Sequence, residues 1–397
     1  MSEWKKVKLK DITISITDGK HGDCKDQDGS GYYFVSCKDV YDGDIHYENA
    51  RQITKEDFED TDRRTKLAPN DILITNSGTI GRMAFVKDQI YTRKTTFQKS
   101  VAIVKPDSSK VFPLYLYYLL QNIVGEFINS ANGAAQKNLL LSTMRDFDLD
   151  VLNSIPCQIR IATILSRYDT LLENYQKQIK LLEEAAQRLY KEWFVDLRFP
   201  GHENTKMVDG LPEGWERKRL VDFAKVTMGQ SPKSEFYNNE RNGLPFHQGV
   251  GSYGNRFVVD ETYSTSYTRI AEPNSVLFSV RAPVGRLNIT KNKIVIGRGL
   301  AAMNHVDGCQ SFLFYLLKER FFKDNIIGNG AIFASISKDE LLNLEFMIPT
   351  DELTYKFNDI AGNIDDAIMK ADNQIRLLTE ARDRLLPRLM GGEIIIN

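Results

Sequence analysis

The stretch Gln178-Ile179-Lys180-Leu181-Leu182 recurs 196 residues later as Gln374-Ile375-Arg376-Leu377-Leu378, and each copy lies inside a long apolar repeat. The repeat positions step alternately by three and four residues, which is typical of a coiled-coil seam. They are Ile161, Ile164, Tyr168, Leu171, Tyr175, Gln178 and Leu182, then Phe357, Ile360, Ile364, Ala367, Ala371, Gln374 and Leu378. A surface helix packed only on its own domain is the alternative, but two matching seams in one chain favour helices that pair with each other. Residues 158–194 would span about 55 Å.

The rest of the chain also contains an internal repeat. Trp4, Leu9 and Asp11 recur as Trp215, Leu220 and Asp222, an offset of 211 residues. The offset is 204 for Gly81-Arg82 and Gly285-Arg286, and 197 for Tyr118-Leu119-Leu120 and Tyr315-Leu316-Leu317. Asn132-Gly133-Ala134 recurs at the same offset as Asn329-Gly330-Ala331, and Asp169 matches Asp365 at 196. An ordered series with a period near 200 residues indicates a duplicated domain pair rather than a solenoid of short repeats.

Each copy begins with short β-rich runs separated by Gly, Asn, Asp and Pro turns, followed by a shorter helical stretch. The predicted fold class is therefore mixed α/β (α+β), with two homologous globular domains joined by two long antiparallel coiled-coil helices in a pseudo-twofold repeat. The expected boundaries are domain 1 at 1–157, helix 1 at 158–196, a linker at 197–212, domain 2 at 213–349, and helix 2 with a C-terminal tail at 350–397. Pro387 should weaken the second helix and Gly391-Gly392 should end it.

Composition narrows the class of protein. Of 397 residues, 42% are apolar and 26% are charged, which excludes a disordered chain, and the formal net charge of −1 argues against a histone-like basic protein. The four cysteines form no CxxC pair, which argues against a disulfide framework and against a cysteine zinc site. No apolar run approaches the roughly 18 residues that cross a membrane. We expect a soluble, cytoplasmic protein without a membrane partner.

Catalytic motifs are missing from the sequence. It contains no GxxxxGK[ST] phosphate loop, no GxGxxG, no HExxH, no GxSxG and no Asn/Asp-Pro-Pro-aromatic motif of an amino-methyltransferase. No histidine pairs with a nucleophile in the sequence, and His21 and Cys24 lack two further ligands for zinc. We therefore expect no catalytic residues and no metal site. A nuclease that uses unrecognised carboxylates is the enzymatic alternative.

Basic residues gather at equivalent places in the two copies. Thr79–Lys105 holds six basic residues and one acid, a charge of +5, and Arg281–Arg298 holds five basic residues and no acid, also +5. A solvated hairpin with ordinary surface lysines would explain one such stretch, but the duplication favours a phosphate-binding face. Reading of bases would also need Arg, Lys, Asn or Gln side chains on loops. The predicted DNA-binding residues are Lys20, His21, Arg82, Arg93, Lys94, Lys99, Gln136, Lys137, Asn138, Gln230, Ser231, Gln248, Arg281, Arg286 and Arg298.

With these features the chain resembles the specificity subunit of a type I restriction-modification enzyme over essentially its whole length. The resemblance rests on Trp-x-x-x-x-Leu at both domain starts, on Leu277-Phe-Ser-Val-Arg-Ala-Pro-Val-Gly-Arg286 with Gly297-Arg-Gly-Leu300, and on Gln158-Ile-Arg-Ile-Ala-Thr-Ile-Leu165. The first domain departs from the pattern, because Thr75-Asn-Ser-Gly-Thr-Ile-Gly81 replaces the Arg-Ala-Pro segment. In this family such divergence implies that the two domains read different half-sites.

The resemblance implies a division of labour among subunits. Each α/β domain would be a target recognition domain for one half of a bipartite double-stranded DNA target, and the helices would set the gap. The helix residues Ile161, Ile164, Tyr168, Leu171, Tyr175, Leu182, Phe357, Ile360, Ile364 and Leu378 would form the spacer and partner-binding surfaces. Two methylation subunits and the restriction subunits would carry S-adenosylmethionine, ATP and Mg²⁺, with none on this chain. The alternative outside this family is a non-enzymatic coiled-coil scaffold with two ligand-binding domains.

Overall fold

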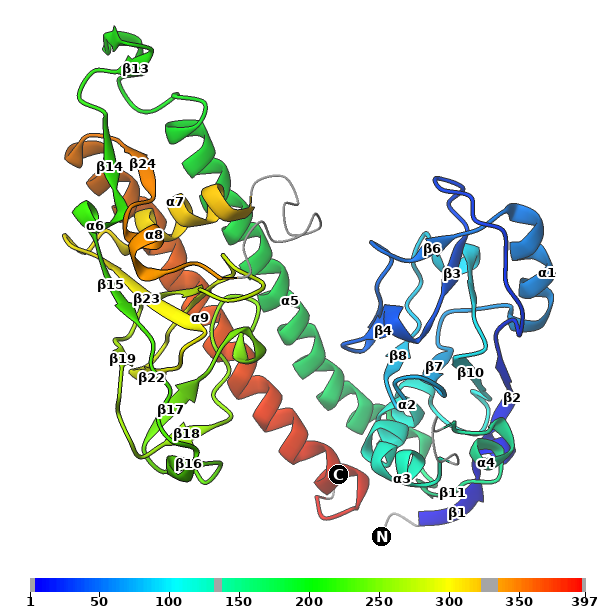
Figure 1. The fold of residues 1–397 in the computed structure, drawn as a ribbon. Coiled ribbons are helices and arrows are strands. Elements are labelled where there is room, and N and C mark those ends of the chain that lie inside the picture. Colours follow the sequence, from blue (N-terminus) through cyan, green and yellow to red (C-terminus); the bar gives the residue numbers. More distant parts are fainter. Residues whose placement is uncertain (1–3, 132–137, 323–334, 395–397) are drawn as a thin grey trace. The chain divides into compact units, whose positions relative to one another are not determined.

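The computed structural model describes residues 4–131, 138–322 and 335–394, which fall into two compact units (Figure 1). Unit 1 comprises Met1–Asn174 with Ile375–Asn397, and unit 2 comprises Tyr175–Gln374. Each unit therefore contains one α/β domain and a part of both long helices. Among the described residues, no helix is long and apolar enough to cross a membrane.

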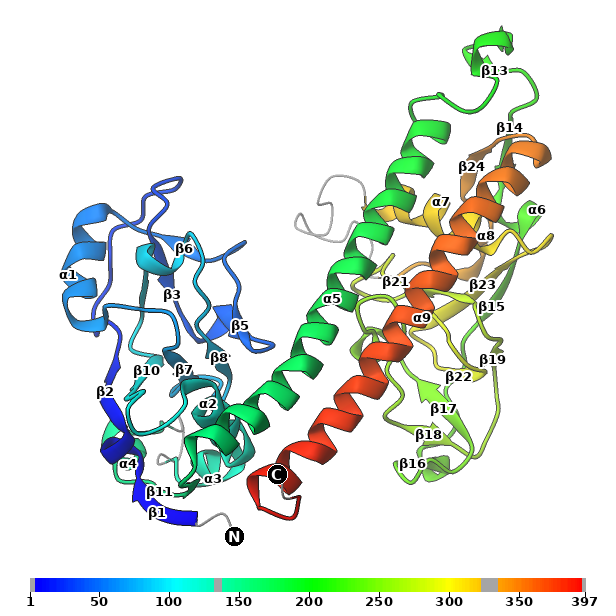
Figure 2. The ribbon, with the colours of Figure 1, turned by 180° about the vertical axis from the view of Figure 1, so that it is seen from behind.

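The two long helices are α5 (Ile155–Phe194) and α9 (Asp351–Met390), each of 40 residues. In unit 2 the rings of Tyr190 and Trp193 on α5 lie 5.6 and 6.0 Å from the Phe357 ring on α9. The second half of α5 runs alongside the first half of α9 in both views (Figure 2). In unit 1 an Arg382 guanidinium nitrogen of α9 lies 2.9 Å from an Asp169 oxygen of α5. Late α5 residues thus meet early α9 residues and the reverse, so the helices pack antiparallel within each unit.

Helix α9 continues through Pro387 and ends before Gly391 and Gly392. Gly392 has a φ of +74°, the left-handed conformation that glycine adopts readily at a helix end. The predicted stop is therefore confirmed. The proline is tolerated because it lies in the last turn, close to the helix end.

Unit 1 contains a four-stranded sheet, a three-stranded sheet and two smaller pairs. The orders are β2-β10-β7-β8 (antiparallel), β6-β3-β9, β1-β11 and β4-β5. The strands are β1 Trp4–Lys8, β2 Thr13–Asp18, β3 Tyr33–Val35, β4 Val40–Tyr41, β5 Asp44–Ile45, β6 Arg51–Gln52, β7 Ile72–Thr75, β8 Met83–Phe85, β9 Thr95–Phe97, β10 Val101–Pro106 and β11 Asp148–Leu152; the shorter helices are α1 Lys55–Thr65, α2 Pro113–Asn122, α3 Val124–Asn129 and α4 Leu141–Arg145.

Unit 2 repeats this plan. Its sheets are β15-β23-β20-β21, β16-β18-β17-β22-β19, β14-β24 and a β12-β13 hairpin. The strands are β12 Met207–Val208, β13 Leu211–Pro212, β14 Glu216–Arg219, β15 Ala224–Met228, β16 Tyr237–Asn238, β17 Leu244–His247, β18 Tyr263–Ser264, β19 Ile270–Ala271, β20 Val276–Ser279, β21 Leu287–Ile289, β22 Ile294–Ile296, β23 Leu300–His305 and β24 Glu345–Ile348; the shorter helices are α6 Leu220–Phe223, α7 Gln310–Phe322 and α8 Lys338–Leu342.

The strand pairings confirm the duplication. β3 and β9 pair in parallel in unit 1, and β17 and β22 form the matching parallel pair in unit 2. The main difference between the two units is helix α1, which lies between β6 and β7 in unit 1. The described part of unit 2 has no α-helix at the matching place, between β18 and β20. The predicted linker, 197–212, contains the short β12-β13 hairpin. Phe199, near the start of the linker, is buried against Trp215.

Each main core includes side chains from both long helices. In unit 1 Ile161 and Leu165 of α5 join Leu389 and Met390 of α9 in the cluster that holds the β2-β10-β7-β8 sheet. In unit 2 the equivalent cluster contains Ala186, Tyr190, Phe357, Ala361 and Ile368, among others. Because the hydrophobic effect scales with buried apolar area, each α/β domain and its helix segments are expected to fold as one unit.

Candidate nucleic-acid interface

The same hydrogen-bonded turn follows β7 in unit 1 and β20 in unit 2, and it carries the repeated arginine, Arg82 or Arg286. In unit 1 the Thr75 hydroxyl donates to a carbonyl in the turn (2.5 Å) and accepts from the Arg82 backbone N–H (2.9 Å). In unit 2 the Ser279 hydroxyl donates to the matching carbonyl (2.6 Å) and accepts from the Arg286 N–H (2.8 Å). A hydroxyl at this position fixes the turn, so the backbone at Arg82 and at Arg286 is held in the same way.

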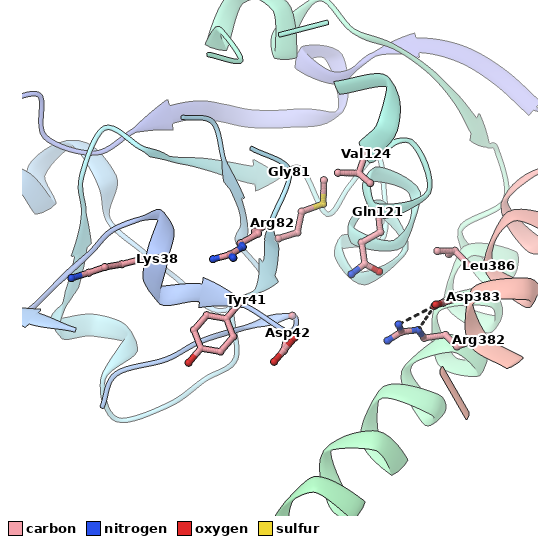
Figure 3. Close-up of a pocket in the computed structure, with 12 residues that line it drawn as sticks. Lys38, Tyr41, Asp42, Gly81, Arg82, Gln121, Val124, Arg382, Asp383 and Leu386 are labelled. Carbon is pink, nitrogen blue, oxygen red and sulfur yellow. Dashed lines mark hydrogen bonds and ion pairs between the residues drawn. The ribbon is translucent and has the colours of Figure 1, made fainter. Parts of the chain in front are cut away.

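Arg82 lines an open cavity of about 780 Å³ in unit 1 (Figure 3). Lys38, Tyr41 and Gln121 come to this cavity from the α/β domain, and Arg382 comes from α9. The charge of Arg382 is already paired, because its guanidinium donates hydrogen bonds to Asp169 and to Asp383 at 2.9 Å each. Among the described residues, Lys38 and Arg82 have no carboxylate partner. Their charges remain available to an anion such as a phosphate.

A second, polar cavity of about 540 Å³ lies beside the first and brings together three of the predicted residues. His21, Lys99 and Asn138 line it, and Lys38 borders both cavities. Asn138 is placed by a backbone bridge to Ser77 at the end of β7. Residues from four loops that are far apart in the sequence therefore meet at one edge of unit 1.

Lys20 and His21 already have internal partners at this edge. The Lys20 ammonium lies 3.0 Å from Asp57 and 3.5 Å from Asp60 on α1, and its side chain is 24% exposed. The hydrogen bond to Asp57 raises the pKa of Lys20. The His21 Nε2 lies 3.0 Å from an Asp18 carboxylate oxygen. Lys20 is thus neutralised within the domain, whereas Lys99 is exposed and has no carboxylate partner among the described residues.

The equivalent edge of unit 2 has a different chemistry. The Ser231 hydroxyl donates to Gln248 Oε1 (2.8 Å) and accepts from the Arg298 backbone N–H (3.2 Å). The Gln230 N–H donates to the carbonyl of Ile296 (2.9 Å). Gln248 and Arg298 are both exposed. The structure therefore joins Gln230, Ser231, Gln248 and Arg298 from three loops into one cluster, which we call the unit 2 edge cluster.

Backbone hydrogen bonds show that Lys99 and Arg298 occupy the same structural position. The contacts that flank these two residues match one for one. They are Gln98 N to Val35 O (2.9 Å) with Gly297 N to His247 O (2.8 Å), and Asn76 N to Ser100 O (3.0 Å) with Val280 N to Gly299 O (2.9 Å). By the same correspondence Arg281, which is exposed and forms a bridge to Ser335, takes the place of Ser77.

A buried histidine supports the unit 2 edge cluster, and it was not predicted from the sequence. The His247 Nδ1 lies 2.8 Å from the Ser252 hydroxyl and its Nε2 lies 3.0 Å from Asp260. The order Ser–His–Asp is that of a hydrolytic triad, but the His247 side chain is 0% exposed, so it has no route to a substrate. Both ring nitrogens are used internally, and this bridge fixes the end of β17 immediately before Gln248.

The remaining predicted residues are scattered or fall outside the described part of the chain. Arg93 is exposed, and the Lys94 ammonium lies 5.8 Å from the centre of the Tyr32 ring. Gln136 and Lys137 lie outside the described residues. Several lysines of the two basic stretches are used in internal ion pairs, so their charges are not left for a phosphate. These pairs are Lys87 with Asp44 and Glu173, Lys105 with Asp71, Lys291 with Asp372, and Lys293 with Glu272.

The structure corrects the predicted seam of the long helices. Leu171 and Ile360 are 45% and 43% exposed, and Gln178 and Gln374 are exposed as well, whereas Leu172 and Ala186 are buried instead. Ile161, Phe357 and Ala371 are buried as expected, and Ile164, Tyr168, Tyr175, Leu182, Ile364, Ala367 and Leu378 are half-buried. A straight helix drifts about 20° per heptad against a strict seven-residue repeat, and each helix must also cover its own domain, so the buried stripe moves around the helix.

A tyrosine–aspartate contact fastens each domain to its helices. The Tyr118 hydroxyl donates to Asp169 on α5, and the Tyr315 hydroxyl donates to Asp365 on α9 (2.9 Å). Burial raises the pKa of both tyrosines, so they stay protonated as donors. Tyr and Asp recur together in the sequence repeat, which is the signal that could have predicted these contacts.

An arginine completes each of these contacts, but the two arginines come from unrelated places. Arg382 of α9 bonds to Asp169 in unit 1, whereas Arg256 of a domain loop bonds to Asp365 in unit 2. Arg256 also lies 3.3 Å from Glu183, and its side chain is 3% exposed. Burial raises the pKa of the Asp365 carboxyl, and the Arg256 charge opposes that rise. No repeat or motif in the sequence pointed to Arg256.

Among the described residues, no three His, Cys, Asp or Glu side chains gather where they could hold a metal ion. The two edges present hydroxyl, amide and cationic groups, with buried histidine and carboxylate groups used internally. Such a set can donate and accept hydrogen bonds and can neutralise phosphates.

Comparisons with known proteins identify the family. The model of the type I restriction modification DNA specificity domain matches residues 1–184 and 212–376. A Methanocaldococcus jannaschii protein with the provisional name type I restriction enzyme MjaX specificity subunit is 30% identical over 410 aligned residues, covering 100% of this chain and 94% of the relative. The type I restriction enzyme HindI specificity subunit of Haemophilus influenzae is 23% identical, covering 99% and 100%.

A solved structure shares the fold. The S subunit of a type I restriction-modification system from M. genitalium aligns with a TM-score of 0.64 at 15% identity, covering 98% of this chain and 96% of that chain. The family match covers both halves of the duplication described above. This chain therefore belongs to the type I restriction-modification DNA specificity family.

Proposed function

We propose that this chain is the non-catalytic, sequence-specific DNA-binding subunit of a type I restriction-modification complex, in which each α/β domain reads one half of a bipartite target. The observation that carries this proposal is the pair of equivalent polar edges around Lys99 and Arg298. The same backbone positions are held by the same hydrogen bonds, yet the side chains differ. A shared scaffold with different contact residues is what two readers of different half-sites require.

The charges at these edges support a nucleic-acid partner. In unit 1 Lys38, Arg82 and Lys99 are exposed and have no carboxylate partner among the described residues. In unit 2 Arg281 and Arg298 are likewise exposed and have no carboxylate partner among the described residues. Cations that stay unpaired within the protein can neutralise phosphates and release counterions, which supplies most sequence-independent affinity for DNA.

The long helices are proposed to set the gap between half-sites and to dock two methylation subunits. At 1.5 Å per residue, a 40-residue helix extends about 60 Å, and its length is fixed by residue number. Leu181 on α5 and Leu377 on α9 are 65% and 49% exposed and match each other in the repeat. Exposed leucines at equivalent positions suit two copies of one partner, since each copy would meet the same surface.

Catalysis is assigned to partner chains in this proposal. Methylation subunits would bind S-adenosylmethionine and extrude the target adenine, and restriction subunits would use ATP and Mg²⁺. The role of this chain is to hold the duplex in register, with phosphate contacts for position and edge contacts for sequence.

Mapping of adenine methylation tests the proposal. A host genome carrying this chain with its methylation subunit is expected to show a split motif with a fixed gap, and deletion of the chain should abolish methylation at that motif. Methylation that persists without the chain, or a motif that does not depend on it, would contradict the proposal.

A further inference from the structure

The unit 2 edge cluster is built where three strand ends converge. Ser231 follows β15, Gln248 follows β17, and Arg298 lies between β22 and β23. Hydrogen bonds run from the Arg298 N–H to Ser231 and from Ser231 to Gln248 (3.2 and 2.8 Å). The three side chains therefore start from backbone positions that are fixed relative to one another.

Glycines make this close approach possible. A Cβ at Gly297 would lie 2.7 Å from Gln248 Oε1 and 2.9 Å from the Gln248 Cα, and a Cβ at Gly299 would lie 2.6 Å from the Gln248 carbonyl oxygen. A Cβ at Gly229 would lie 2.1 Å from the Gly297 carbonyl oxygen. These distances are too short for any other residue without backbone movement. The Arg298 loop is thus packed directly on the Gln248 loop.

The chemistry of the cluster suits a base edge better than a phosphate. Phosphate oxygens only accept hydrogen bonds, so they have no use for acceptors. Gln248 Oε1 and Ser231 Oγ each accept one hydrogen bond within the cluster and keep a second lone pair, next to the donors of the Arg298 guanidinium and of the Gln248 amide. A base edge offers both donors and acceptors, so the whole cluster can be used.

The Arg298 guanidinium can also donate two parallel hydrogen bonds to one partner. It is exposed and has no carboxylate partner among the described residues, in contrast to Lys20 of unit 1, which is paired with Asp57. A guanidinium can donate two parallel hydrogen bonds to O6 and N7 of guanine in the major groove, and no other base presents that pair of acceptors there. The position is occupied in unit 1 by Lys99, whose ammonium is a point charge without the planar fork.

We propose that Arg298 reads a guanine in the half-site recognised by the second domain, with Ser231 and Gln248 contacting the same or the adjacent base pair. This inference rests on the proposed function and deepens it by naming a specificity-determining residue and the base that it selects.

The test compares three variants of the full chain expressed with its methylation subunit. Arg298→Gln removes the charge and the fork, and Arg298→Lys keeps the charge but removes the fork. Arg217→Gln makes the same charge change on β14, an exposed position at the opposite end of this domain from β17 and β22 (Figure 1). Methylation of DNA libraries randomised in the target is sequenced, and exchange of residues 213–349 shows which half-site belongs to the second domain. Thermal unfolding of each variant checks that the domain remains folded.

The wild type is expected to require a guanine in that half-site. Arg298→Gln should lose a roughly five- to 150-fold preference for guanine at that one position, the value of one bidentate contact, while the first half-site is unchanged. Arg298→Lys should keep only part of that preference, because the ammonium lacks the planar fork. Arg217→Gln should leave the preference intact. A second half-site without a required guanine would overturn the inference. So would Arg298 variants that weaken methylation equally on all sequences, which would make Arg298 a phosphate contact. Failure of the proposed function would look different, because no split motif would depend on the chain at all.

Discussion

Replacement of Arg256 by alanine should destabilise unit 2 strongly. The Arg256 guanidinium contacts the carboxylates of Asp365 on α9 and Glu183 on α5, and it lies 4.5 Å from the centre of the Phe314 ring. Its side chain is 3% exposed. The alanine variant would leave two carboxylates facing an empty space at the place where the domain meets both helices.

The size of the loss follows from this burial. Removal of one partner from a buried ion pair costs about 3–5 kcal/mol, because the other charge stays desolvated. Asp365 and Glu183 keep 19% and 31% exposure, so we expect the lower end of that range. For a unit of this size, about 3 kcal/mol corresponds to a fall in Tm of roughly 6–12 °C.

Thermal unfolding followed by circular dichroism measures the change, and hydrogen exchange assigns it to Tyr175–Gln374. The matched control is Arg198→Ala, since Arg198 also bonds to a carboxylate, Glu192, but is 54% exposed. The control should cost no more than about 1 kcal/mol. Equal small effects in the two variants would refute the reasoning that burial makes Arg256 important.

The loss should also depend on pH. Burial raises the pKa of Asp365 above its ordinary 3.8, and Arg256 opposes the rise, so in Arg256→Ala this pKa should rise further. Between the ordinary and the folded pKa, the folded state then binds more protons than the unfolded state, and stability falls as pH rises. The difference between variant and wild type should therefore be smaller at pH 5 than at pH 8.

Three further predictions concern other positions. Burial lowers the pKa of Lys318 from 10.5, so wild-type stability should rise with pH through the window below that value; Lys318→Met should remove this rise and add roughly 1 kcal/mol at neutral pH, as measured by urea unfolding. Gly297→Ala should impair methylation that depends on the second half-site, because its Cβ would lie 2.9 Å from the Gln248 backbone. Gly251→Ala is the control, because its Cβ would have nothing within 4 Å, and equal effects of the two variants would contradict the packing argument. Leu181→Glu should reduce co-purification of the methylation subunit with a stability change within about 0.5 kcal/mol, while Val306→Glu, a similarly exposed control, should not affect it.

The duplication made much of the architecture predictable. The match of Gly81-Arg82 with Gly285-Arg286, for example, corresponds to a turn with the same hydrogen bonds in both units. The two long helices and the end of α9 at Gly391 were likewise predictable, because seam spacing and helix-breaking residues are local signals.

The buried stripe of the helices was harder to predict. Leu171 and Leu172 are adjacent and equally apolar, so a heptad count favoured the wrong one. The choice depends on where the domain packs against the helix, which is a tertiary property.

Ion-pair partners were also beyond the sequence pattern. Lys20 meets Asp57 because α1 lies beside β2, and Arg256 meets Asp365 across more than 100 residues. A count of basic residues in a stretch does not distinguish lysines used inside the protein, such as Lys87, from those left for a ligand, such as Lys99.

The most direct test of the central claim is a methylation map after exchange of residues 1–157 for the corresponding domain of another family member. If each domain reads one half-site independently, the exchange should change one half of the split motif and leave the other half and the gap unchanged. A motif that changes in both halves, or that does not change at all, would contradict the account.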